Sequence, residues 1–191
     1  MSRVKITMPE QFLFSLQRAV GISDLNYARH LDSVSMVRIV HEARLQFLAD
    51  LGFTEANIFG LGMVVTDLAV DYQSESFAND VLNIEVGVGR FNRYGCDICF
   101  QITNTALDRV VCNAKTGVVF FDFDKHKIAL VPKAFREMLE RSEQDADWLT
   151  PHWLVSRVLS KSDYFPLFDS TDIPGHECRH THPFNCHYDF A

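Results

Sequence analysis

Only one stretch of this sequence has the hydrophobic spacing of a long helix. Apolar side chains there recur every three or four residues and so fall on one helical face: Met36, Val40, Ala43, Phe47 and Leu51. Asp32 or Ser33 is suited to cap the start of this helix, and Gly52 stands where a helix commonly ends. The sequence therefore predicts one long and mostly buried helix between these signals.

The remaining regular patterns belong mainly to strands. Apolar residues alternate with polar ones, or run together, in five segments: about 12–17, 63–72, 82–89, 96–103 and 110–123. Because the connections after residue 62 are short, neighbouring strands are expected to pair antiparallel. A short helix is expected at Pro132–Arg141, since proline is favoured in the first turn of a helix.

This order of elements predicts an α+β fold, with an antiparallel sheet wrapped around one long central helix. A single helix cannot cover both faces of a five-stranded sheet, so the sheet is expected to curve around it. The edge strands would stay open unless chains pair, which favours a homodimer or a dimer of dimers, that is, a homotetramer. The domain is expected to span residues 1–142, followed by an acidic, partly irregular C-terminal extension, 143–191.

The composition excludes several classes of function. The 191 residues are 47% hydrophobic and 23% charged, as in a typical globular domain. The net charge of −7 argues against nucleic-acid binding, which needs concentrated positive charge. No apolar run approaches the ~18–20 residues of a membrane span, and residues 1–10 lack the apolar core of a signal peptide. Five irregularly spaced cysteines do not suggest a disulfide framework, so a reducing, cytoplasmic location is expected.

The C-terminal extension contains a cluster of residue types that bind zinc. Six potential ligands lie close together there: His176, Cys178, His180, His182, Cys186 and His187. Their spacing matches no standard zinc finger. We interpret the cluster as part of a polar tail and expect neither a metal nor another cofactor.

The residues around the start of the long helix carry a more specific pattern. Asp24, His30, Leu31 and the run Glu42-Ala43-Arg44 stand in one register without a gap. This register resembles that of the hot-dog-fold thioesterases, the 4-hydroxybenzoyl-CoA thioesterase-like hydrolases of acyl-CoA and acyl-carrier-protein substrates. The resemblance covers about residues 10–141. It implies the hot-dog fold and hydrolysis of acyl thioesters without a metal or redox cofactor.

The resemblance also implies a catalytic turn made of Asp24, Asn26 and His30. The family's second Asp, a nucleophile or general base in many members, is Asn26 here, and an amide cannot act as a base. Asp24 or Asp32 paired with His30 is one way to retain activity. The alternative is a non-catalytic acyl-CoA-binding module, a sensor or scaffold, whose base is lost at Asn26. A purely structural role for the turn also stays open, since Asp and Asn are common turn residues.

Thioester hydrolysis further needs donors for the developing oxyanion. The N–H groups around Leu31, Asp32 and Ser33 are expected to supply them, because a helix N-terminus carries unpaired donors at the positive end of its dipole. Glu42 lies on the helix, and we interpret it as a partly exposed charge and not as a catalytic group.

The phosphates of CoA require basic residues near the substrate channel. Arg90 and Arg93, in a predicted hairpin turn, are the first candidates. Lys115, Lys125 and Lys127 are alternatives. A simpler interpretation is that all five of these basic residues are ordinary solvent-exposed charges.

Overall fold

The long helix predicted from the hydrophobic spacing is α1, Ser33–Asp50. The computed structural model describes residues 4–144. Asp32 caps the start of α1, where its Oδ1 accepts a hydrogen bond from the Val34 N–H at 2.9 Å. The chain leaves the helix through Gly52, whose φ of +84° suits glycine. Both predicted ends of the helix are therefore confirmed.

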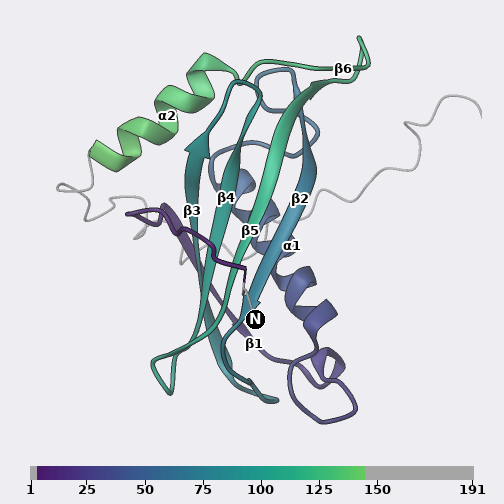
Figure 1. The fold of residues 1–191 in the computed structure, drawn as a ribbon, viewed down its shortest axis with the longest axis vertical. Helices are drawn as coiled ribbons and strands as arrows, with labels where there is room; N and C mark the ends of the chain where they lie inside the picture. Colours follow the sequence, from purple (N-terminus) through teal and green to yellow (C-terminus); the bar gives the residue numbers. More distant parts are fainter. Residues whose placement is uncertain (1–3, 145–191) are drawn as a thin grey trace, which may run out of the picture. The chain divides into compact units, whose positions relative to one another are not determined.

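Within the described residues, six strands form one antiparallel sheet, in which β1, β3, β4, β5 and β2 follow one another and β6 pairs with β5. The strands are β1 Phe14–Ala19, β2 Gly62–Tyr72, β3 Val81–Phe91, β4 Gly95–Asn104, β5 Arg109–Asp122 and β6 Lys127–Ile128. Figure 1 shows the sheet in front and α1 behind it, with the strands curving around the helix. The predicted α+β architecture, an antiparallel sheet wrapped around one central helix, is confirmed.

The expectation that consecutive strands pair is wrong for β2 and β3. β2 pairs with β5, with Met63 opposite Phe120, and β3 pairs with β1, with Ile84 opposite Leu16. Strands β5 and β4 lie between β2 and β3, a sideways distance of about 14 Å at ordinary strand spacing. The connecting residues 73–80 reach about 26 Å when extended, so this short connection can cross the end of the sheet.

The hydrophobic core fills the space between α1 and the concave face of the sheet. Alternate residues of β3 point into it (Leu82, Ile84 and Val86), and so do Phe100 and Ile102 of β4. The buried face of α1 packs against these side chains through residues that include Met36, Ile39, Val40, Ala43, Phe47 and Leu48.

A second helix, α2 (Lys133–Gln144), covers one end of the sheet and confirms the predicted short helix. Phe135 of α2 packs against Phe120 of β5, with ring centroids 5.4 Å apart.

Three cysteines lie in the strands as free, buried side chains, as predicted: Cys96, Cys99 and Cys112. Burial raises the pKa of Cys96 and Cys112 to about 12 and the pKa of Cys99 to about 11. These thiols stay protonated at neutral pH and serve as small apolar side chains.

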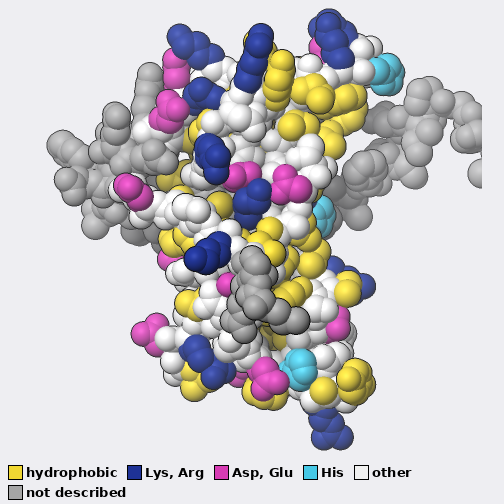
Figure 2. Space-filling model, in the orientation of Figure 1, with side chains coloured by type: hydrophobic (Ala, Val, Ile, Leu, Met, Phe, Trp, Pro, Cys, Tyr) yellow, Lys and Arg dark blue, Asp and Glu magenta, His cyan; other side chains and the backbone are white. Residues whose placement is uncertain are grey.

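The convex face of the sheet, opposite α1, carries charged side chains and part of the N-terminal segment. Lys115 of β5 bridges Asp67 of β2 at 2.9 Å and Asp97 of β4 at 3.3 Å. Figure 2 shows basic and acidic side chains close together on this face. The N-terminal segment crosses β3 at Gly87, where a Cβ would lie 2.6 Å from Pro9 Cγ and 2.8 Å from the Gln11 carbonyl oxygen. A residue without a side chain is therefore needed at this crossing.

Most of the predicted C-terminal extension, 143–191, lies outside the described residues, and so does the His/Cys cluster at 176–187. Only residues 143 and 144 are described, at the end of α2. Among the helices of residues 4–144, none is long and apolar enough to cross a membrane.

Candidate active site

The turn Asn26–His30 folds back on itself directly before α1. The Asn26 N–H donates to the His30 carbonyl at 3.0 Å, and the Arg29 N–H donates to the Asn26 carbonyl at 2.9 Å. The Asn26 side chain closes the turn, since its Oδ1 accepts from the Ala28 N–H at 2.9 Å. Its amide nitrogen points to the imidazole instead, 3.4 Å from Nε2 and 3.5 Å from Nδ1 of His30. The turn brings together two of the three predicted catalytic residues, an amide donor and an imidazole.

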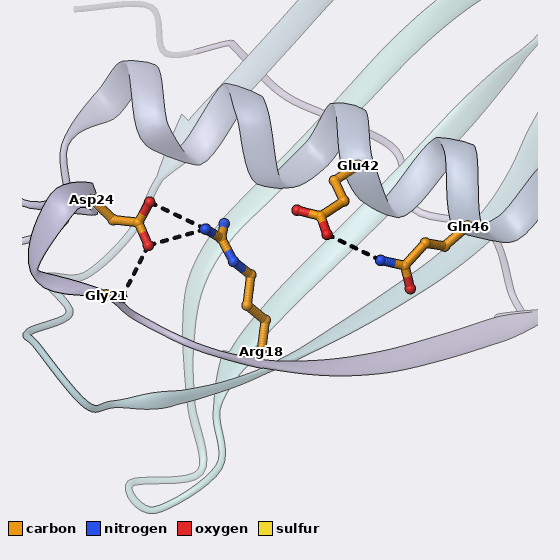
Figure 3. A network of polar contacts seen from close by, with 5 residues as sticks. All are labelled: Arg18, Gly21, Asp24, Glu42 and Gln46. Carbon is orange, nitrogen blue, oxygen red and sulfur yellow. Dashed lines mark hydrogen bonds and ion pairs between the residues drawn. The ribbon is translucent and has the colours of Figure 1, made fainter. Parts of the chain in front are cut away.

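The third of them, Asp24, is held in another set of contacts. Arg18 Nη2 lies 3.1 Å from both of its carboxylate oxygens, and the Gly21 N–H donates to Oδ2 at 2.9 Å (Figure 3). Asp24 is only 8% exposed and is not among the residues that line the pocket described below. Its position fits a structural role, in which it fastens the end of β1 to the turn.

The predicted oxyanion donors differ in whether their N–H groups are available. The Leu31 N–H donates to the Ser76 carbonyl at 2.8 Å, and the Asp32 N–H donates to the Asp24 carbonyl at 2.9 Å. The Ser33 N–H, at the first position of α1, has no hydrogen-bond partner among residues 4–144. Of the three, Ser33 is thus the one with a donor left for a ligand.

A pocket of about 400 Å³ lies between this turn, the start of α1 and the loop that follows β2. Its lining comes from both sides: Asn26, His30, Leu31, Ser33, Met36, Tyr72, Gln73, Ser74, Glu75, Ser76 and Val111. The two sides are joined by the Leu31–Ser76 hydrogen bond and by a β-bridge between His30 and Phe77. We refer to this cavity as the turn pocket.

Tyr72 ties the end of β2 to the start of α1 at the wall of the turn pocket. Its hydroxyl donates to the Ser33 carbonyl at 3.0 Å. Burial, with the nearby Cys112 and Asp32, raises the pKa of Tyr72 above its ordinary value of 10.0. The phenol therefore remains a protonated donor throughout the neutral range.

Glu42 and Arg44 lie further along α1, and neither lines the turn pocket. Glu42 is exposed, and Figure 3 shows its carboxylate turned to Gln46, whose amide donates to it at 3.1 Å. Arg44 is buried, with Nε 2.7 Å from Glu55 Oε1 and Nη2 2.7 Å from His41 Nδ1. The interpretation of Glu42 as an exposed helix charge agrees with this position.

Arg90 and Arg93 lie at the opposite end of β3 from the loop that lines the turn pocket. Arg90 borders a different cavity of about 480 Å³, beneath N-terminal residues 7–11, and Arg93 stacks on Tyr94 at 5.5 Å. The eight residue-to-residue steps from Leu82 to Arg90 span about 27 Å of strand. Within one chain these arginines are therefore remote from Asn26 and His30, and phosphate binding by them stays a prediction.

Half of the turn pocket was not identified from the sequence. Tyr72, Glu75, Ser76 and Val111 are separated from the turn by 40 residues or more, and no local spacing connects them to it. Only the tertiary contact between the turn and the loop after β2 brings them to the same cavity. Arg109 also lies near this pocket, because its Nη2 donates a hydrogen bond to the Glu75 carbonyl at 3.1 Å.

The chain belongs to the thioesterase-like superfamily, whose family model matches residues 20–139. The match includes the whole turn pocket and strands β2 to β6. No curated protein matches the chain significantly.

Solved structures of similar fold include several thioesterases. A 1,4-dihydroxy-2-naphthoyl-CoA thioesterase from Synechocystis, Slr0204, is 17% identical, with a TM-score of 0.60 over 70% of this chain and 97% of that one. The probable thioesterase YbaW from Escherichia coli is 20% identical, with a TM-score of 0.56 over 67% and 97%. SAV2348 from Staphylococcus aureus, solved in complex with CoA, is 11% identical, with a TM-score of 0.63 over 73% and 89%. Together with the family match, these structures confirm the hot-dog fold that the resemblance implied.

Proposed function

We propose that this chain hydrolyses acyl thioesters, of CoA or of an acyl-carrier protein, to the free acid and the thiol. The observation that carries the proposal is the unpaired Ser33 N–H at the start of α1, in a pocket that also contains Asn26 and His30. A donor at the positive end of a helix stabilises the oxyanion that forms when water attacks a thioester carbonyl. The amide nitrogen of Asn26 is a second donor for the same oxygen.

In this scheme the thioester carbonyl enters the turn pocket with its oxygen near Ser33 and Asn26. Water attacks the carbonyl carbon and gives its proton to a basic group of the pocket, and His30 is the one residue of the turn that can accept it. The tetrahedral intermediate then collapses, the carbon–sulfur bond breaks, and the leaving thiolate takes up the proton that the basic group had accepted from water. The chain's own residues supply every group that this scheme uses.

Two variants of Ser33 test the role of its N–H. Proline is favoured at the first position of a helix, and Asp32 already has an extended backbone that is compatible with a following proline. Ser33→Pro therefore removes the donor while keeping the helix start, and kcat is expected to fall by about 10²–10³-fold. Ser33→Ala is the matched control, because it keeps the N–H and removes only the hydroxyl.

The measurement is release of free thiol from short, long and aromatic acyl-CoAs, and from an acyl-carrier protein, with an enzyme blank that corrects for the five cysteines. Wild-type turnover above about 0.1 s⁻¹ supports catalysis, since enzymes typically reach about 10 s⁻¹. Equal loss in Ser33→Pro and Ser33→Ala would contradict the role of the N–H.

The alternative is a module that binds acyl-CoA without hydrolysing it, and Asn26 is the observation that favours it. Asn26→Asp decides between the two, because a carboxylate at this position can keep the bond from the Ala28 N–H and adds a base. Hydrolysis gained by Asn26→Asp in an inert wild type would identify the binding module. An active wild type excludes it.

For the phosphates of CoA we propose Arg29 and Arg109 in addition to the predicted Arg90 and Arg93. Arg29 precedes His30 in the exposed turn, and Arg109 reaches the backbone of Glu75. Both lie at the end of the molecule that holds the turn pocket, and guanidinium groups suit phosphate oxygens.

We also propose that two chains pair through β2, in the reducing environment of the cytoplasm that the free cysteines favour. β2 is an edge strand of 11 residues, and Val64, Val65 and Leu68 are 37–43% exposed on it. An unpaired apolar edge of this length favours association. Light scattering is expected to give twice the 21.9 kDa of one chain, and Leu68→Lys is expected to give a monomer. A monomeric wild type at micromolar concentration would contradict the pairing.

A further inference from the structure

The turn pocket holds one carboxylate among its described lining residues, and it belongs to Glu75. Glu75 is in the loop after β2, on the side of the cavity opposite the turn. Its side chain is exposed and makes no hydrogen bond or ion pair with any described residue. A residue that lines a cavity and whose carboxylate has no partner is available to take a proton from bound water.

The backbone around Glu75 is fixed on both sides. Its own carbonyl accepts from Arg109 Nη2 at 3.1 Å, and the next carbonyl, of Ser76, accepts from the Leu31 N–H at 2.8 Å. Asp80 Oδ2 holds the following residues through the Ser76 hydroxyl at 2.7 Å and the Phe77 N–H at 2.8 Å. These contacts hold the backbone of Glu75 at the wall of the turn pocket and leave its carboxylate unused.

The other carboxylates near the turn pocket have partners. Asp24 is bound by Arg18 and Gly21, and Asp32 caps the Val34 N–H. Asp80 holds its own loop, and Asp71 accepts from Gln73 Nε2 at 3.3 Å. Of the acidic residues around the cavity, Glu75 is thus the one whose carboxylate is free within the described chain.

His30 is less available as the base than its position suggests. The Asn26 amide nitrogen is within 3.5 Å of both ring nitrogens, so a hydrogen-bond donor already lies next to the imidazole. A neutral imidazole has only one such lone pair.

We propose that Glu75 is the general base of the hydrolysis and takes the role that Asn26 cannot perform. The carboxylate accepts one proton from water while the water oxygen forms its bond to the thioester carbon. When the carbon–sulfur bond breaks, Glu75 passes this proton through the imidazole of His30 to the thiolate. One water and one thioester give one acid and one thiol. The inference rests on the proposed thioesterase activity.

Glu75→Gln tests the base, since it keeps the size of the side chain and removes the charge. The kcat for the best acyl-CoA of the panel is expected to fall by about 10²–10⁴-fold, with KM changed by less than about threefold. Glu85→Gln is the matched control: Glu85 lies on β3 and alternates with the core residues Ile84 and Val86, so it faces away from α1. Its kcat is expected to stay within about twofold of wild type.

Rescue by a small carboxylate separates a catalytic role from a structural one. In Glu75→Ala, added formate is expected to raise kcat in proportion to its concentration, whereas formate is expected to leave wild type and Glu85→Gln unchanged. Glu75→Gln with at least half of the wild-type kcat would overturn the inference and leave His30 as the base of an intact thioesterase. A wild type without hydrolysis would overturn the proposed function, and the inference with it.

Discussion

Replacing His30 with alanine is expected to lower kcat/KM for acyl-thioester hydrolysis by about 10²–10⁴-fold, the usual contribution of a proton-transferring side chain. The imidazole lines the turn pocket, and among residues 4–144 its side chain hydrogen-bonds only to the Asn26 amide, at 3.4–3.5 Å. Its removal therefore takes away chemistry and little packing. Thiol release under subsaturating substrate gives kcat/KM, and circular dichroism of the same sample shows whether the fold is kept.

Asp24→Asn is the informative comparison for His30, because both positions were predicted to be catalytic from the same turn. Asp24 is tied to Arg18 and Gly21, so loss of its charge is expected to lower the free energy of unfolding by about 1–3 kcal/mol. Activity measured well below the unfolding transition is expected to fall by less than tenfold. If folded Asp24→Asn loses as much activity as His30→Ala, Asp24 takes part in the chemistry.

Glu55→Ala is expected to lower the free energy of unfolding by about 3 kcal/mol, near the lower end of the values for breaking a buried ion pair. Glu55 Oε1 lies 2.7 Å from Arg44 Nε, and the Arg44 side chain is only 6% exposed. Without Glu55, the guanidinium on α1 stays buried next to His41 and loses its counter-ion. Urea unfolding followed by circular dichroism measures the change.

The double variant Arg44→Met with Glu55→Ala controls for the lost packing. It removes both charges, so no buried cation is left without a counter-ion, and about half or more of the lost stability is expected to return. A loss below about 1 kcal/mol in Glu55→Ala would show that the 27% exposure of Glu55 lets water replace it.

The elements of the fold could be predicted from the sequence because helix and strand spacing are local properties. The face of α1 that holds Met36 and Phe47 and the alternation of Leu82 and Ile84 are visible along the chain. The order of the strands is not local, and this is why β2 was expected beside β3. Its pairing with β5 depends on 39 or more residues of intervening chain that no short window contains.

The residues of the candidate site also fall into a group that local sequence predicts and a group that it does not. Asn26, His30 and Ser33 lie within eight residues and could be found from their register in the turn. Glu75 and Tyr72 reach the pocket only through tertiary contacts. The availability of a donor was not predictable either: the Leu31 and Asp32 N–H groups bond to Ser76 and Asp24, and these partners are set by the folded loop.

The hydrogen bond from Tyr72 to the Ser33 carbonyl joins the last residue of the edge strand β2 to the first residue of α1. Ser33 also carries the N–H that we propose for the oxyanion. Thermal fluctuations of the sheet edge therefore reach this donor through a single bond. A contact that reduces the motion of β2, such as pairing with a second chain, therefore also reduces the motion of the Ser33 N–H. The mobility of this sheet edge thus affects how well the Ser33 N–H is aligned with a bound thioester.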